Sequence, residues 1–305
     1  MKTPVLFLIF NRLDYTKQSF EQIRTAKPAR LYIAADGPRA DKIGEDKIVR
    51  EVRDWVLNNI DWKCKVSTLF RDKNLGCGRA ISEAITWFFK NEECGIILED
   101  DIVPSQSFFS FCEEALERYK DNKKVWTVSG CQFDSGLDKE QDYGFSRFFM
   151  CWGWATWRDR WSKFDWHLNW DEKFIDKFTD DKNIRLGLKT IFRRHKKGCN
   201  TWAWKMQFLV MKNNGLNVQP AYNLVTNIGA DGRGYHNDFN NPDIGLKRTE
   251  MPKKWGGVRH PPKVAENPEF SRYQLYAHAH SPYNKGRRRR PIGNAVDWIV
   301  KFLFG

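Results

Sequence analysis

Short apolar segments alternate with stretches of helical spacing in the first third of the chain, and this alternation restricts the fold more than any other feature. The apolar segments have the length of strands and cover residues 4–10, 31–35, 66–70 and 95–98. The intervening stretches place apolar residues on one helical face and cover residues 15–25, 46–60 and 80–90. A further helix over 108–119 and a strand over 125–128 continue the pattern. Strands that alternate with helices predict an α/β fold with a mostly parallel sheet and right-handed crossovers.

Polar residues follow each of the first four predicted strands. They are Asn11 and Arg12, then Asp36, then Arg71, and finally Glu99, Asp100 and Asp101. In open parallel sheets, ligands bind beyond the carboxyl ends of the strands. We therefore expect these side chains to converge on one binding site, although any one of them alone could be an ordinary solvated loop residue.

The acidic run Glu99-Asp100-Asp101 comes directly after an apolar strand. Three adjacent carboxylates repel one another, so a cation or solvent must stabilise them. Such a site of oxygen donors suits Mg²⁺ or Mn²⁺ held together with a substrate diphosphate. We expect Asp101 to bind the metal, and Asp100 and Glu99 to form hydrogen bonds with the ribose or the donor sugar. The simpler alternative is an acidic loop without a metal.

Composition limits the class of protein. With 305 residues, 29% charged, 41% hydrophobic and 15% aromatic, the chain has the make-up of a globular protein with a full core. Its seven cysteines are dispersed without a CxxC pair, which favours reduced thiols over disulfides or a zinc site. The apolar opening is short and contains Pro4, so we interpret it as a strand and expect a cytoplasmic protein. No P-loop motif is present, and Gly76-Cys77-Gly78 is too short a signal for a dinucleotide site.

The net charge of +13 is concentrated near the C-terminus, where residues 287–290 are all arginine. Residues 292–304 follow with apolar side chains on one helical face, which is typical of an interfacial membrane anchor. Docking on the protein itself or a dimer contact would be the alternative. Because no nucleic-acid motif accompanies the charge, we expect no nucleic-acid partner. We divide the chain into a nucleotide-sugar-binding half (1–130), an acceptor-binding half of the same domain (131–245) and a basic extension (246–305).

Several motifs together carry a family resemblance. They are PVLFLIFNR, AADGPR, RDKNLGCGRAISEAI, ILEDDIVPSQSFFSF and CWGWATWR. In these the chain resembles nucleotide-sugar glycosyltransferases of the GT-A fold, which is Rossmann-like. The acidic segment is similar to that of N-acetylglucosaminyltransferase I. The stretch from Thr3 to about Gly234 resembles bacterial glycosyltransferase-2-like proteins, often labelled haemolysin-like.

The resemblance implies roles on the nucleotide side of the site. Asn11, Arg12 and Asp36 would contact the nucleotide, with Asp36 accepting a hydrogen bond from a uracil ring. Arg71 and Arg79 would line the same side. The alternative for Arg79 is a pair with a glutamate four residues along its helix.

The resemblance also implies contacts with the metal and the sugars. Asp101 would bind Mn²⁺ or Mg²⁺. Gly153 and Trp154 would lie against the donor or acceptor sugar, whereas Trp152 and Trp157 fit core packing equally well. His236 would close the metal site, or would be an ordinary surface histidine.

Inverting transfer also needs a general base. In the bacterial relatives this carboxylate follows a pattern close to Asn-Ser/Thr-Trp-Asp, but the chain has Ala203 where the aspartate is expected. Three explanations remain open: the chain is a variant inactivated at this position, another acid serves as the base, or the protein binds without catalysing. The candidate acids are Asp134, Asp171 and Asp231.

The function that these observations favour is a metal-dependent, inverting glycosyltransferase. It would move a sugar from a nucleotide sugar, with UDP as the expected nucleotide, to a bacterial surface glycan or a lipid-linked glycan. A peripheral position on the inner face of the cell membrane would suit such an acceptor. The alternatives are a sugar-phosphate nucleotidyltransferase and a non-catalytic basic protein that binds membrane or nucleic acid.

Overall fold

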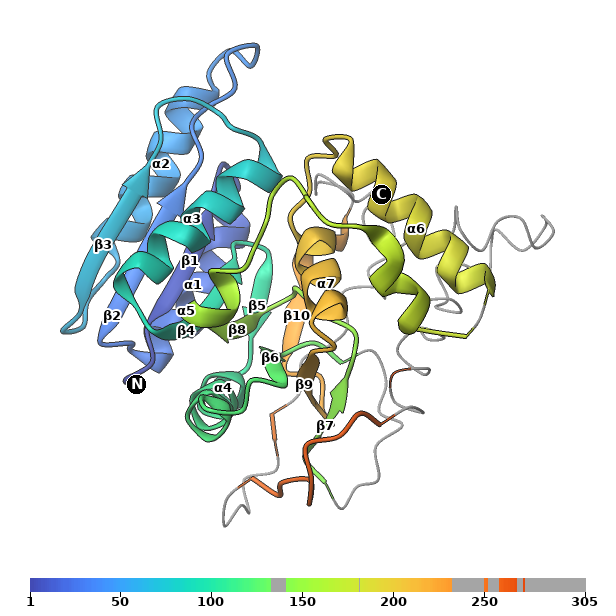
Figure 1. Ribbon diagram of the computed structural model, residues 1–305. Helices are drawn as coiled ribbons and strands as arrows, with labels where there is room; N and C mark the ends of the chain where they lie inside the picture. Colours follow the sequence, from blue (N-terminus) through green and yellow to red (C-terminus); the bar gives the residue numbers. More distant parts are fainter. Residues whose placement is uncertain (133–140, 181, 232–249, 252–257, 268–270, 272–305) are drawn as a thin grey trace.

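The structure is a computed structural model that describes residues 1–132, 141–180, 182–231, 250–251, 258–267 and 271 (Figure 1). Its centre is a single sheet to which both halves of the chain contribute. The strands of this sheet are β1 (Val5–Ile9), β2 (Arg30–Ala35), β3 (Lys65–Phe70), β4 (Cys94–Glu99), β6 (Val125–Ser129), β7 (Tyr143–Ser146), β8 (Trp154–Trp157) and β9 (Leu216–Pro220). They lie in the order β3-β2-β1-β4-β8-β6-β9-β7. A separate antiparallel pair joins β5 (Ile102–Pro104) to β10 (Val225–Asn227).

The first four strands of the chain are parallel to one another, and so are β6 and β9. Only β7 and β8 pair with their neighbours in the antiparallel sense among the strands of this sheet that the structure describes. The prediction of a mostly parallel, Rossmann-like α/β sheet is confirmed. Sequence alternation predicted the order of the first elements, but it did not predict β7 or the pair β5 and β10.

Helices cover both faces of the sheet (Figure 1). One face packs against α1 (Leu13–Ala26), α2 (Glu45–Asn58) and α4 (Gln106–Tyr119). The other packs against α3 (Cys77–Asn91), α5 (Arg158–Trp161) and α7 (Ala203–Lys212). Beyond α7 lie α6 (Lys182–Lys196) and the 3-10 helix η1 (Glu172–Lys177), and a second 3-10 turn, η2 (Ile228–Asp231), follows β10.

The side chains of β1 show why the sequences of the central strands are continuously apolar. Val5, Phe7 and Ile9 belong to the core on the α1 side, whereas Leu6 and Leu8 belong to the core on the α3 side. Successive side chains of a strand point to opposite faces, and both faces are covered here. Every residue of the strand is therefore buried.

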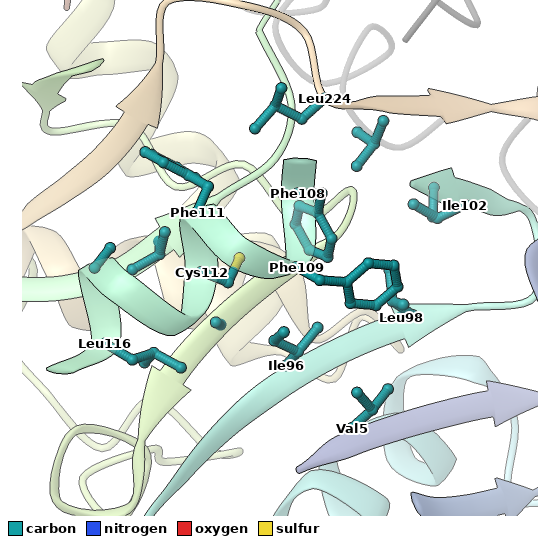
Figure 2. Packing of buried hydrophobic residues seen from close by; sticks show 14 of the residues in the cluster. Val5, Ile96, Leu98, Ile102, Phe108, Phe109, Phe111, Cys112, Leu116 and Leu224 are labelled. Carbon is teal, nitrogen blue, oxygen red and sulfur yellow. The ribbon is translucent and has the colours of Figure 1, made fainter. Parts of the chain in front are cut away.

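The core beneath α4 shows how the helix that precedes β6 packs on the sheet. Figure 2 shows Phe108 and Phe109 of α4 beside Ile96 and Leu98 of β4. All four side chains are almost fully buried. Burying an aromatic or aliphatic side chain of this size contributes roughly 1.5–3 kcal/mol, so these contacts hold α4 against β4, the strand that ends in the acidic run.

A late segment of the chain returns to the edge strand β7. Arg259 forms ion-paired hydrogen bonds with the fully buried Asp142, and Asn267 donates its backbone N–H to the carbonyl of Phe145. His260 bonds the hydroxyl of Tyr143 through Nδ1 at 2.8 Å. Residues 258–267 thus cover one edge of the sheet.

In the described part of the chain, no helix has both the length and the apolar character needed to cross a bilayer. The expected membrane anchor over 287–304 lies outside the described residues.

Candidate functional site

The carboxyl ends of four strands bring the predicted polar residues to one edge of the sheet. The registers align Ile9 with Ala35, Ala35 with Phe70, and Leu8 with Glu99. Residues that follow these positions therefore lie along one rim. Asn11, Arg12, Asp36, Arg71 and the acidic run follow these positions along the rim, and of these residues Arg12 contacts Asp100 and Asp101.

Arg12 is the cation that contacts the acidic run on this rim. Its Nη2 forms a short ion pair with Asp100 and a second ion pair with Asp101 Oδ2 at 3.1 Å. Its guanidinium also lies over the ring of Tyr15, with 4.9 Å between Cζ and the ring centroid. Burial alone would lower the pKa of Arg12, but the two aspartates raise it above its ordinary value. Arg12 therefore stays charged and neutralises part of the acidic run.

The acidic run is held by its backbone as well. The hydroxyl of Ser19 donates to the carbonyl of Asp100 at 2.8 Å, and the N–H of Ile228 donates to the carbonyl of Asp101 at 2.9 Å. A methyl group placed on Gly229 would come within 2.5 Å of Asp101 Oδ2, so η2 packs directly on this carboxylate. The Asp101 side chain thus has little freedom to turn away from the rim.

Glu99 and Asp100 are shifted toward their protonated forms. Burial, followed by the charges of Asp101 and Asp100, raises the pKa of Glu99 to about 8. Burial also raises the pKa of Asp100 to about 6, although Arg12 opposes the shift. Burial thus favours the protonated form of Glu99, and a carboxyl group in that form can donate a hydrogen bond to a hydroxyl as well as accept one.

Asp36 has a role that the sequence did not indicate. Its carboxylate accepts hydrogen bonds from the backbone N–H groups of Gly37, Leu75 and Gly76, at 2.9 to 3.1 Å. In this arrangement Asp36 anchors the loop before α3. The resemblance assigned this carboxylate to a uracil ring, whereas here both of its oxygens are engaged by the loop.

The glycine turn before α3 is packed against a segment from the second half of the chain. Gly76 has a positive φ of 78° and precedes the first residue of α3. A methyl group on Gly76 or Gly78 would come within 2.5 and 2.7 Å, respectively, of Asn200. Asn200 Oδ1 is buried and has no hydrogen-bond partner among the described residues. The glycines thus allow Asn200 to reach the N-terminus of α3, where backbone N–H groups favour anions.

The two arginines expected on the nucleotide side share one carboxylate. Arg71 Nη2 lies 3.3 Å from Glu83, and Arg79 Nη2 lies 3.2 Å from the same side chain. The pair between Arg79 and Glu83, named above as the alternative, is therefore present. Arg79 also lies over the ring of Trp166, with 5.4 Å between its Cζ and the ring centroid.

Glu45 is a rim residue that the sequence reasoning missed. It is buried, accepts hydrogen bonds from the Asn11 amide at 2.9 Å and from the Arg39 backbone at 2.6 Å, and pairs with the Arg39 guanidinium. Burial alone would raise the pKa of Glu45, but the hydrogen bonds from Arg39 and Asn11 lower it. In the sequence, a glutamate in the first turn of a helix indicates no more than a favourable interaction with the helix N-terminus. Its contact with Asn11 is seen in the structure alone.

Gly153 and Trp154 are core residues here, which corrects the expectation that they face a sugar. Trp154 is 1% exposed, and its ring stacks on Trp202 at 5.4 Å and meets Phe149 edge-on at 4.9 Å. Gly153 has a positive φ of 60°, and a methyl group there would meet Val225 at 2.8 Å. Neither residue offers a free face to a pyranose ring. Trp157 is likewise buried.

The candidate base positions lie on different elements. Ala203 is the first residue of α7, three residues after Asn200, and is almost fully buried. Asp171 caps η1 by accepting from the N–H of Lys173. The backbone of Asp231 belongs to η2, the turn that packs on Asp101, whereas its side chain, Asp134 and His236 lie outside what the structure describes.

A metal at this rim would have few ligands from the protein. Among the described residues, no three His, Cys, Asp or Glu side chains gather as a metal-binding group. Asp101 carries carboxylate oxygens of the kind that Mg²⁺ and Mn²⁺ prefer. The donor set fits a metal whose remaining ligands are phosphate oxygens and water, and does not fit one enclosed by protein alone.

Neither a protein-family model nor a curated protein matches the sequence. Similar solved structures include a UDP-glucose pyrophosphorylase in complex with UDP-glucose, with 10% identity, a TM-score of 0.38, and 75% of this chain and 94% of that chain covered. Mouse xyloside xylosyltransferase 1 has 11% identity and a TM-score of 0.34, over 69% of this chain and 81% of that chain. The Streptococcus pneumoniae glycosyltransferase GlyE has 10% identity and a TM-score of 0.34, over 71% of this chain.

The chain spans less than half of GlyE, with 45% of that protein covered. These neighbours comprise both transferases of sugars and a pyrophosphorylase. At such identities and TM-scores these similarities assign no activity to this chain.

Proposed function

We propose that the chain is a metal-dependent, inverting glycosyltransferase that uses a nucleotide sugar, with UDP as the expected nucleotide. The observation that carries this proposal is the rim itself. A cation, an acidic run and the N-terminus of α3 meet at the carboxyl edge of a parallel sheet. That combination suits a ligand with both negative phosphates and neutral hydroxyl groups.

Each group has a part in holding the donor. The N-terminus of α3 and Arg12 provide N–H donors for a diphosphate. Asp101 would hold Mn²⁺ or Mg²⁺, and the bound metal would stabilise the charge that develops on the departing nucleoside diphosphate. Glu99, at the end of β4 beside Asp100 and Asp101, suits a hydrogen bond to a sugar hydroxyl. Asn11, held by Glu45, offers an oriented amide to the nucleotide.

The transfer step requires a base on the acceptor side. The acceptor oxygen would form a bond to the anomeric carbon while the bond to the diphosphate breaks, and the hydroxyl proton would pass to a carboxylate. Ala203 cannot accept a proton. Of the other acids named above, Asp231 lies on the turn that packs on Asp101, which makes it the first alternative to examine.

The experiment measures nucleoside diphosphate release from a panel of nucleotide sugars with Mn²⁺ or Mg²⁺, with and without glycan acceptors. The proteins compared are the chain as it stands, Ala203→Asp, Asp231→Asn, and Asp61→Asn as a control. Asp61 is exposed, pairs with Arg24 and precedes β3, so it lies at the amino ends of the parallel strands, away from the rim at their carboxyl ends. A gain in transfer for Ala203→Asp supports the base position. If no protein releases nucleoside diphosphate from any sugar, the proposed activity is wrong.

A sugar-phosphate nucleotidyltransferase is the rival enzyme. The link between β1 and α1 consists of residues 10–12 and contains no glycine, so it lacks the glycine-rich loop used to hold a triphosphate. The same panel separates the two activities. Pyrophosphate release from a nucleoside triphosphate and a sugar phosphate would favour the rival.

The proposal extends to the acceptor through the basic C-terminal sequence. Residues 287–290 and the amphipathic pattern after them suit anionic lipid, which would place the protein beside a lipid-linked glycan. Deletion of residues 286–305 should then abolish sedimentation with vesicles that contain anionic lipid, because basic residues are attracted to an anionic surface. Unchanged sedimentation would refute the membrane part of the proposal.

A further inference from the structure

The acidic run already has a cation, because Arg12 contacts both aspartates that would otherwise meet a metal. Its Nη2 pairs closely with Asp100 and lies 3.1 Å from Asp101 Oδ2, and its Nε is 3.4 Å from the other oxygen of Asp100. Among the described residues, Arg12 accounts for every ion pair of this run. One oxygen of the expected metal ligand is therefore engaged by a guanidinium.

All three residues are held by their backbones, since the carbonyl of Arg12 also accepts a hydrogen bond from the Thr16 hydroxyl at 2.8 Å, and the difference lies in the freedom of the side chains. The backbone of Asp100 is bonded by Ser19, and that of Asp101 by Ile228. Gly229 packs against the Asp101 side chain. The Arg12 side chain, by contrast, keeps 23% of its surface exposed on the rim, and its long stem has rotamers that a carboxylate lacks. If a metal takes the Asp101 oxygen, Arg12 is the group that moves.

We propose that Arg12 competes with the divalent cation for Asp101, so that metal enters the site together with a nucleoside diphosphate. This inference rests on the proposed function, whose metal and donor it concerns. A metal alone would have to displace Arg12 and leave a guanidinium without its carboxylates. When a metal arrives with a diphosphate, Arg12 loses its ion pair with Asp101 but gains ion pairs with the phosphate oxygens, so the guanidinium is not left without an anionic partner.

The exchange couples the two ligands. The diphosphate strengthens metal binding by giving Arg12 a new partner, and the metal strengthens diphosphate binding by the same factor, as linkage requires. Without an arginine paired to its aspartates, the acidic run would not need a diphosphate in order to bind the metal. It would bind free Mn²⁺ whether or not a nucleotide is present.

The test measures Mn²⁺ affinity by the loss of the free-ion electron paramagnetic resonance signal, with and without UDP. Two variants isolate the competition. Arg12→Gln removes the competing cation but leaves Asp100 buried without a partner. Arg12→Gln with Asp100→Asn also removes that buried charge, and it keeps the summed charge of Arg12, Asp100 and Asp101 the same as in the unmodified chain. The control is Arg24→Gln, since Arg24 pairs with Asp61 at the opposite edge.

Without UDP, both Arg12 variants should bind Mn²⁺ at least roughly tenfold more tightly than the unmodified chain, as expected from freeing a charge-assisted pair. UDP should tighten Mn²⁺ binding strongly in the unmodified chain and much less in the variants. Arg24→Gln should behave like the unmodified chain. Unfolding curves establish that each variant is folded.

The proposal is overturned if the charge-matched double variant binds Mn²⁺ no more tightly than the unmodified chain without UDP, including the case in which neither binds. It is also overturned if UDP binds and tightens Mn²⁺ binding by the same factor in every protein. Failure of the proposed function looks different. In that case UDP binds none of the proteins even with Mn²⁺, while the nucleotide-free comparison still reports on Arg12.

Discussion

The side chain of Lys205 in α7 is buried, and it forms no ion pair with a carboxylate in the part of the chain that the structure describes. Its Nζ donates to the carbonyls of Trp166 and His195 at 2.8 and 3.0 Å and lies 4.5 Å from the centroid of the Trp166 ring. Burial lowers the pKa of Lys205 to about 8, although Cys199 and Asp165 act in the opposite direction. This residue ties α7, which begins at Ala203, to the end of α6 and to the loop before η1.

The lowered pKa of Lys205 gives stability a defined dependence on pH. Between about pH 8 and pH 10.5 the unfolded chain holds more protons on this group than the folded chain does, so stability rises with pH across that window. Relative to Lys205→Met, the unmodified chain should gain about 3 kcal/mol of unfolding free energy from pH 7.5 to pH 10.5. Urea unfolding at a series of pH values measures this difference. Lys212→Met, an exposed change in the same helix, should give no such slope, and a flat difference for Lys205→Met would contradict the account.

Single residues also show what the sequence could predict about the site. Strand ends predicted which residues would share a rim, because that follows from parallel topology alone. The partners could not be predicted, since they come from elements distant in the chain. Asp36 is engaged by a loop about forty residues later, and Asn11 is oriented by Glu45 at the start of α2.

At the scale of elements, the loop over residues 72–76 links the sheet to the N-terminus of α3. The backbone of Lys73 passes so close to Gly37 that a methyl group there would lie 2.4 Å from it. Asn74 donates to the Gly37 carbonyl at 2.8 Å, and Asp36 bonds the end of the loop. The position of the α3 N-terminus therefore depends on contact between two stretches of backbone.

Gly37→Ala should disturb this loop. The added methyl group meets backbone atoms that cannot rotate away, so we expect a loss of about 1–3 kcal/mol in unfolding free energy and weaker binding of nucleotide sugar. Chemical denaturation and calorimetric titration measure the two effects. The control is Gly44→Asn. An added Cβ at Gly44 meets no atom within 4 Å, and asparagine is chosen because it tolerates the positive φ of this position better than alanine does. Equal behaviour of the two variants would contradict a role for the Gly37 contact.

The elements differed in how far the sequence predicted them. Strands β1, β2 and β4 are buried on both faces, so their apolar runs were clear. In β8, the tryptophans belong to a motif that the resemblance linked to sugar binding, whereas pairing with β4 and β6 makes the segment a central strand. Its partners are far apart in sequence, and local periodicity does not report them.

At the scale of the whole molecule, residues 258–267 return to the edge strand β7. Asp142 is fully buried and accepts from both the backbone and the guanidinium of Arg259. Arg147 pairs with Glu266 at 2.5 Å. An edge strand exposes unpaired backbone groups unless another segment covers it, and this return segment covers part of β7.

Asp142→Asn should loosen the return segment. The variant keeps the shape of the side chain but loses its charge, so we expect a loss of roughly 2 kcal/mol from the charge-assisted bonds to Arg259. Hydrogen exchange should accelerate in residues 142–146 and 258–267 together, with strands β1 to β4 unchanged. A uniform acceleration over the whole sheet would contradict a local contact.

The central claim is that the rim binds a nucleotide sugar with a metal held by Asp101. Calorimetric titration of nucleotide sugars, with and without Mn²⁺, tests it in the unmodified chain, in Asp101→Asn and in the control Asp61→Asn. We expect Mn²⁺-dependent binding in the unmodified chain and in Asp61→Asn, and binding at least about tenfold weaker in Asp101→Asn, which lacks the carboxylate charge. Equal affinity in all three proteins, or binding of no nucleotide sugar under either condition, would contradict the claim.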